Sequence, residues 1–84
     1  MSPHNFPSLR LNQLVSRLER FLITSRAGKG SELILEGKTV ISKKFARFIL
    51  GRHKANREIP RELLRRIFHR FEISSEDFFA DSIH

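Results

Sequence analysis

Two short basic turns hold the residues of this 84-residue chain whose types suit chemistry on a phosphate. The first has the sequence Gly-Lys-Gly-Ser-Glu at residues 28–32, between a short apolar run and an alternating segment. The second has Gly-Arg-His-Lys at residues 51–54, after the apolar run 48–50. Glycines let a backbone approach a phosphate closely, and the basic side chains supply positive charge. The turns therefore predict a surface that binds a polyanion, and its expected phosphate-binding residues are Lys29, Gly30, Ser31, Arg52 and Lys54.

Glu32 and His53 form a candidate catalytic pair on this surface. Cleavage of RNA without a metal ion needs a base that takes the 2′-hydroxyl proton and an acid that protonates the leaving oxygen. A carboxylate can be the base and an imidazole the acid if the two strand ends lie side by side. Lys29 and Arg52 would then stabilise the charge on the phosphorane. The alternatives are that Glu32 is an ordinary exposed strand residue facing a Lys or Arg, and that His53 is one polar residue of a basic loop.

The charge balance points to an anionic partner. Sixteen Lys and Arg against nine Asp and Glu give a net charge of +7. Nucleic acid is the first expected partner, although a basic surface can also serve only to keep a protein soluble. There is no cysteine, and the four histidines are scattered along the chain, so we expect neither a disulfide, nor a metal site, nor a small-molecule cofactor.

The length allows one domain with a modest core. We expect residues 8–80 to form this domain, residues 1–7 to be disordered and residues 81–84 to be frayed. Residues 1–7 do not have the pattern of a signal peptide or a membrane anchor, and no apolar run approaches the roughly 20 residues that a membrane span needs. We therefore expect a cytoplasmic protein without a membrane partner.

The hydrophobic pattern of the first half predicts a helix followed by strands. Ser8 can cap a helix with an apolar face at Leu11, Leu14, Val15, Leu18 and Leu22. Strands are predicted near residues 22–26, 31–36 and 45–50, with a turn at residues 27–30 and a hairpin turn at residues 36–38. Residues 39–44 are compatible with an extended hairpin or a loop.

The second half predicts helices. Pro60 is expected in the first turn of a helix whose apolar face is formed by Leu63, Leu64, Ile67, Phe68 and Phe71. Arginines lie off this face, and two of them, Arg61 and Arg65, are expected to bind RNA. Ser74 can cap a last short helix. The fold class is therefore α+β, an α-β-β-β-α domain with helices on one face of an antiparallel sheet and a short extra C-terminal helix.

This order of motifs resembles the HicA toxin family. The resemblance runs from about Leu9 to Ala80 and is carried by Lys29-Gly30-Ser31, Gly51-Arg52-His53-Lys54, Asn56, Glu58-Ile59-Pro60, Leu63-Leu64-Arg65-Arg66-Ile67 and Ile73-Ser74-Ser75-Glu76-Asp77-Phe78. It implies a double-stranded-RNA-binding-like fold, an mRNA endoribonuclease activity and an acidic HicB-like antitoxin as partner. The family's catalytic histidine follows the Gly-Ser turn, where this chain has Glu32.

Two other functions fit the sequence. The chain could be a non-catalytic RNA-binding module of the same fold. Residues 60–79 are also similar to the closing helices of helix-turn-helix DNA-binding domains. That alternative requires a chain without strands between residues 22 and 50.

Overall fold

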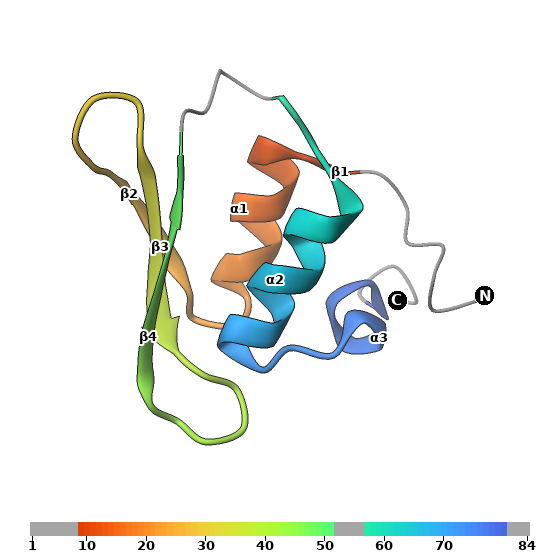
Figure 1. Ribbon diagram of the computed structural model, residues 1–84. Helices are drawn as coiled ribbons and strands as arrows, with labels where there is room; N and C mark the ends of the chain where they lie inside the picture. The colour runs from red at the N-terminus through yellow and green to blue at the C-terminus, as the bar shows by residue number, and fades with distance from the viewer. Residues whose placement is uncertain (1–8, 52–56, 81–84) are drawn as a thin grey trace.

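A sheet and a pair of helices form the two layers of this protein (Figure 1). The computed structural model describes residues 9–51 and 57–80. The elements in chain order are β1 (Leu9–Arg10), α1 (Leu11–Glu19), β2 (Thr24–Ala27), β3 (Leu33–Lys38), β4 (Phe45–Leu50), β5 (Glu58–Ile59), α2 (Arg61–Phe71) and α3 (Ser75–Phe78). The predicted α+β class is confirmed, with three antiparallel strands between the two longer helices.

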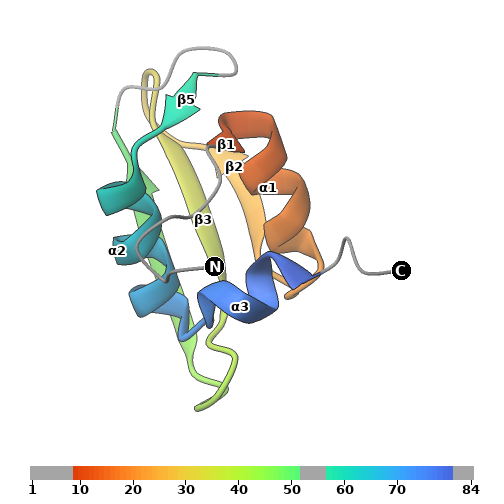
Figure 2. The ribbon, with the colours of Figure 1, turned by 90° about the vertical axis from the view of Figure 1, so that its right-hand side faces the viewer.

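The main sheet has the strand order β2-β3-β4, and both ladders are antiparallel. β3 is the central strand, with Leu33 opposite both Ala27 of β2 and Leu50 of β4. A second, two-stranded ladder pairs β1 with β5, so that Leu9 lies opposite Ile59. This ladder joins the chain just before α1 to the chain just before α2, and it therefore holds the starts of the two helices together (Figure 2).

The core lies between the helices and one face of the sheet (Figure 1). The predicted apolar faces point into it: Leu14 and Leu18 of α1 are buried, as are Leu64, Ile67 and Phe71 of α2. Leu35 and Leu50 contribute from the sheet. The helical spacing of three and four residues places these side chains on one stripe, so each helix can bury its apolar side while its charged side stays in water.

α3 closes one end of this core, running across the ends of α1 and α2 (Figure 2). Ser74 caps it as predicted, because its hydroxyl accepts hydrogen bonds from the Glu76 and Asp77 amides. Phe78 is fully buried, with its ring centroid 4.7 Å from that of Phe68. Arg17 of α1 donates a hydrogen bond to the Phe78 carbonyl at 3.3 Å, so the short helix contacts α2 through this ring and α1 through its backbone.

The predicted helix starts were wrong by one or two residues. The N-cap of α1 is Arg10, not Ser8, which lies outside the described residues. Pro60 is the N-cap of α2 instead of its first helical residue, with a ψ of 149°. In both cases the preceding residue belongs to the β1–β5 ladder, and this pairing keeps the chain extended up to the cap. Leu22 was expected on the apolar face of the first helix, but it lies beyond the end of α1 and is exposed.

The hairpin turn predicted at residues 36–38 is also wrong. β3 continues through Gly37 to Lys38, which pairs with Phe45, and the connection is the loop at residues 39–44. A Cβ on Gly37 would lie 2.7 Å from the Leu22 carbonyl oxygen and 2.9 Å from the Ile23 Cα. The glycine therefore allows the chain after α1 to pass close to β3 and does not mark a turn.

The loop at residues 39–44, which the sequence left open, is held by hydrogen bonds to the end of α2. The Glu72 carboxylate accepts hydrogen bonds from the Ile41 amide at 3.2 Å, and from the Ser42 amide and hydroxyl at 2.7 and 3.0 Å. The Val40 amide donates to the Phe71 carbonyl at 2.8 Å. The loop is therefore part of the packed structure, and β4 begins directly after it at the predicted Phe45.

Candidate nucleic-acid interface

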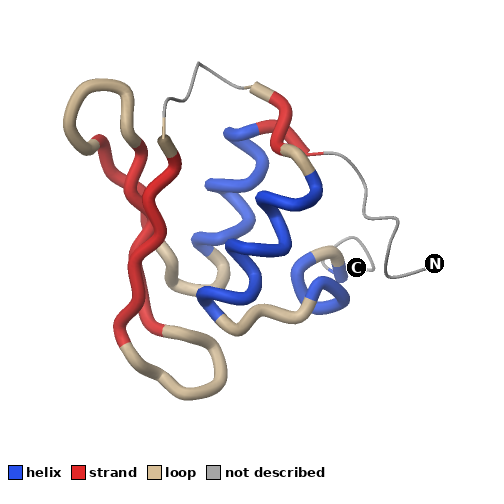
Figure 3. The backbone as a smooth tube through the Cα atoms, in the orientation of Figure 1, coloured by secondary structure: helices blue, strands red, loops and turns tan. Residues whose placement is uncertain are grey.

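The Gly-Lys-Gly-Ser-Glu segment connects β2 to β3 at one end of the sheet, opposite the end with the loop at residues 39–44 (Figure 3). The Gly28 amide donates to the Glu32 carbonyl at 2.9 Å, and the Glu32 amide donates to the Lys29 carbonyl at 3.0 Å. Gly30 has a φ of +59°, which L-residues rarely adopt. These bonds make the turn that the sequence predicted, and Lys29, Gly30 and Ser31 are exposed at its tip.

Glu32 lies at the base of this turn, one residue before β3 begins. It is half-buried, and its side chain lies over Gly28, where an added Cβ would be 3.2 Å from the Glu32 Oε1 atom. Within the described part of the chain, no Lys or Arg forms an ion pair with Glu32. The carboxylate is therefore not an exposed strand residue that faces a basic side chain in those segments.

The sheet register brings the start of the second predicted turn to the end of the sheet that holds the first turn. Leu33 pairs with Leu50, so Glu32 and Gly51 are the next residues beyond the ends of neighbouring strands. This satisfies the backbone condition for pairing Glu32 with His53. Arg52, His53 and Lys54 lie outside the described residues, so the side-chain geometry of the pair stays a prediction.

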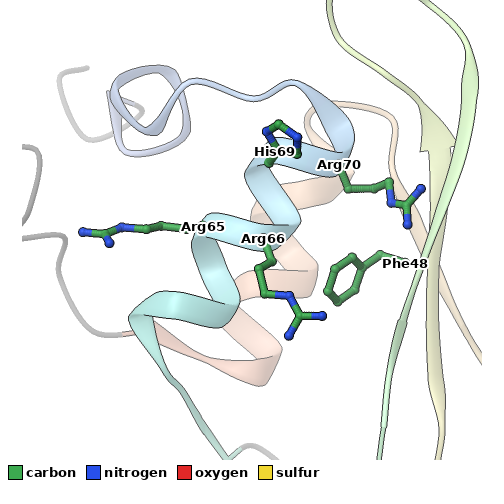
Figure 4. Close-up of a pocket in the computed structure, with 5 residues that line it drawn as sticks. All are labelled: Phe48, Arg65, Arg66, His69 and Arg70. Atoms are coloured by element: carbon green, nitrogen blue, oxygen red, sulfur yellow. The ribbon is translucent and has the colours of Figure 1, made fainter.

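α2 supplies the other predicted basic residues. Arg61 and Arg65 are exposed on it, as are Arg66, His69 and Arg70. Four of these side chains and one ring of β4 line an open pocket of about 620 Å³, which we call the arginine pocket (Figure 4). Its lining residues are Phe48, Arg65, Arg66, His69 and Arg70.

The arginine pocket gathers positive charge around an aromatic wall. Arg66 and Arg70 extend towards the β4 side, where Phe48 points back at α2, while Arg65 extends away from the strand (Figure 4). The Arg66 guanidinium carbon is 5.8 Å from the centroid of the Phe48 ring. Among the described residues, the lining has three guanidinium groups and an imidazole but no carboxylate. An anion that enters this pocket would meet several donors, and guanidinium groups bind phosphate in a bidentate manner.

Arg66, His69 and Arg70 were not among the predicted site residues. The spacing of Arg66 and Arg70 by four residues already placed both on one side of the helix. That signal was visible, but the sequence did not show that Phe48 of β4 would lie beside them. The pocket exists because α2 packs along this edge strand of the sheet (Figure 1).

The opposite face of the sheet has basic residues that are partly neutralised. The Glu36 carboxylate accepts a hydrogen bond from the Arg26 Nε at 2.6 Å and from the Arg47 Nε at 3.1 Å. The Arg26 hydrogen bond, followed by that of Arg47, lowers the pKa of Glu36 below its usual value. Because one carboxylate already binds two guanidinium groups there, the arginine pocket is the stronger candidate for an anion.

The described segments contain neither a group of metal ligands nor a membrane-spanning helix. In residues 9–51 and 57–80, no three His, Asp or Glu side chains are grouped so that they could hold a metal ion. None of the described helices is long and apolar enough to cross a membrane. Comparison with family models, with curated proteins and with solved structures found no match to this chain.

Proposed function

We propose that this protein binds RNA through the arginine pocket and the Lys29 turn. The observation that carries the proposal is the lining of the pocket, where the described residues include three arginines and a histidine. The net charge of +7 favours association with a polyanion. The chain has no Tyr or Trp, so we expect recognition of phosphates and helix shape more than of bases.

The more specific proposal is a HicA-like toxin with a double-stranded-RNA-binding-like fold. Its support is the order helix, three antiparallel strands, helix, with both helices on one face of the sheet. Under this proposal the chain acts on mRNA in the cytoplasm, Glu32 and His53 perform metal-independent cleavage, and an acidic HicB-like protein covers the basic surface. Arg61 and Arg65, together with Arg52 and Lys54, would add contacts to the RNA backbone.

The second candidate is a non-catalytic RNA-binding module of the same fold. The observation in its favour is Glu32 itself, because the resemblance puts a catalytic histidine at this position. Helix-turn-helix DNA binding is the weaker alternative. Four strands, β2 to β5, separate α1 from α2, and α3, which follows α2, has only four residues.

The test measures RNA affinity as a function of salt concentration. A labelled RNA duplex is titrated with the wild type, with Arg66→Gln/Arg70→Gln and with the control Arg26→Gln/Arg47→Gln, which removes the same charge from the other sheet face. Each lost phosphate contact should flatten the slope of log affinity against log salt by about 0.7 to 0.9. We expect the pocket variant to lose up to about two such contacts and the control to keep the wild-type slope. Equal losses in both variants would show that net charge alone governs binding and would contradict the proposal.

A further inference from the structure

Leu22 has a backbone conformation that leucine rarely adopts. Its φ is 64°, and it ends the first helical segment in a Schellman motif. The Leu22 amide donates to the Glu19 carbonyl at 2.9 Å, and the Ile23 amide donates to the Leu18 carbonyl at 3.1 Å. The left-handed residue of this motif is usually glycine, because a Cβ is unfavourable there.

Glu72 occupies the same position at the end of α2, and there hydrogen bonds of the side chain offset the unfavourable backbone conformation. Its φ is 59°, and the Ile73 amide donates to the Phe68 carbonyl at 2.9 Å. The Glu72 side chain holds the loop at residues 39–44 through three hydrogen bonds. A glycine at this position would relieve the backbone but would release the loop.

The Leu22 side chain has no comparable internal role in the described part of the chain. It is 81% exposed, so it contributes almost nothing to the core. A glycine would suit the backbone better and would remove an apolar side chain from water. Strain and apolar exposure at one residue indicate that the side chain serves something outside the fold.

Leu22 lines an open hollow of about 590 Å³, formed where the chain after α1 meets the end of β3. Phe45, which also lines it, is 63% exposed. Ile41, 78% exposed, lies in the loop that forms one side. The described residues of this lining include the basic Arg20, Lys38 and Lys43 and no carboxylate. We call this site the Leu22 hollow.

We propose that the Leu22 hollow binds an acidic amphipathic segment of a partner protein, with Leu22 as the central apolar contact. The apolar side chains would cover one face of the segment, and Lys38 and Lys43 would pair with its carboxylates at the rim. The hollow shares no lining residue with the arginine pocket, so this inference does not depend on RNA binding.

Two other occupants fit the hollow less well. A second copy of this chain in a symmetric contact would place the basic rim of one hollow against the same rim of its partner, which costs free energy. RNA would gain little from exposed aliphatic side chains, because its bases prefer aromatic or guanidinium planes. Charge and apolar character together therefore favour an acidic protein segment.

The probe is a short synthetic peptide with Leu and Phe on one helical face and Asp and Glu on the other. It is titrated into the full, isotope-labelled chain while backbone and methyl resonances are followed. We expect shifts at Leu22, Lys43 and Phe45, and weaker binding by about tenfold for Leu22→Gly. The melting temperature of Leu22→Gly should equal or exceed that of the wild type, because glycine suits the left-handed backbone.

Controls separate an apolar contact from simple charge attraction. A peptide with Ser in place of Leu and Phe, and one with Lys in place of the acids, should both fail to shift these residues. Ile49→Ala, which changes an exposed side chain outside the hollow, should keep the wild-type affinity. Lys38→Glu/Lys43→Glu should lose binding without a change in the backbone at Leu22, which tests the charge argument separately.

Several results would overturn the proposal. These are the absence of shifts in the hollow, equal binding of the Ser peptide, and unchanged affinity of Leu22→Gly. Concentration-dependent dimerisation that Leu22→Gly abolishes would assign the hollow to a second copy. Displacement of the peptide by an RNA duplex whose affinity depends on Leu22 would assign it to nucleic acid.

Discussion

At the scale of single residues, the proposed catalytic pair belongs to the end of the sheet where the β2–β3 turn lies. Glu32 sits beside the start of the segment that contains His53, because Leu33 and Leu50 are paired. Lys29 is exposed at the tip of the same turn. The proposed nuclease would use Glu32 as its base, and a test of Glu32 therefore distinguishes a nuclease from a binding module.

We predict that Glu32→Ala and His53→Ala each reduce ribonuclease activity by about 10²–10⁴-fold. Activity of the wild type should persist in EDTA and show a bell-shaped pH profile, because the base must be ionised and the acid protonated. The measurement is cleavage of single-stranded and duplex RNA by purified protein, with Glu19→Ala as the control. Cleavage that survives both substitutions would indicate a contaminant or another site. Absence of cleavage by the wild type would leave the binding module.

At the scale of elements, glycine and glutamate fix how neighbouring segments meet. Gly37 lets the chain after α1 pass close to β3, and Glu72 ties the loop at residues 39–44 to α2. Both contacts join segments that are distant in sequence. The Leu22 hollow is bounded by these same segments, so its shape depends on them.

We predict that Gly37→Ala destabilises the fold by about 1–3 kcal/mol, because its Cβ would clash with the backbone of residues 22 and 23. Gly51→Ala is the matched control, since a Cβ there would meet no atom within 4 Å. Chemical denaturation followed by far-UV circular dichroism measures both. Equal stability of the two variants would show that the α1–β2 connection can move away from β3 at little cost.

The stabilisation from the hydrogen bonds between the Glu72 carboxylate and the loop at residues 39–44 should depend on pH. Hydrogen bonds, first of all from the Ser42 amide, lower the pKa of Glu72 below its usual value of 4.5. Because the folded-state pKa is the lower one, this stabilisation is present above about pH 4.5 and is lost as the pH falls through the lowered pKa. We predict that Glu72→Gln reduces the acid dependence of the melting temperature in this range, whereas Glu62→Gln, at the other end of α2, does not. An unchanged acid dependence in Glu72→Gln would contradict this.

At the scale of the whole molecule, one small core supports two separate candidate surfaces. The core is completed by α3, whose Phe78 ring packs on Phe68 and near Phe21. The arginine pocket and the Leu22 hollow have no lining residue in common. The fold can therefore present a basic pocket and an apolar hollow with a basic rim at the same time.

We predict that Phe78→Ala costs about 3–5 kcal/mol, because removing this fully buried ring opens a cavity in the core. The free energy of unfolding of a small domain is only roughly 5–15 kcal/mol, so the variant should lose a large part of it and melt at a lower temperature. Phe45→Ala, an exposed ring, should change the free energy of unfolding by less than about 1 kcal/mol. Thermal unfolding compares the two. A cooperative wild-type transition in Phe78→Ala would show that α3 is not needed for the core.

The sequence by itself determined the elements whose stability is local. The helical spacing of apolar residues predicted the buried face of α2, the apolar run predicted β4, and Ser74 marked the start of α3. The exposed position of Arg61 and Arg65 followed from the same spacing. These features depend on side-chain periodicity and capping, which act over a few neighbouring residues.

Only the tertiary structure decided the features that join distant segments. Because of the β1–β5 ladder, both helices begin later than predicted. Residues 36–38, predicted as a turn, belong to β3, where Gly37 lies close to the chain after α1. The arginine pocket needed Phe48 beside α2, and the exposed, left-handed Leu22 could not be told from a core leucine by its spacing. Each of these features depends on which segments pack together, and a local pattern of residue types does not determine that packing.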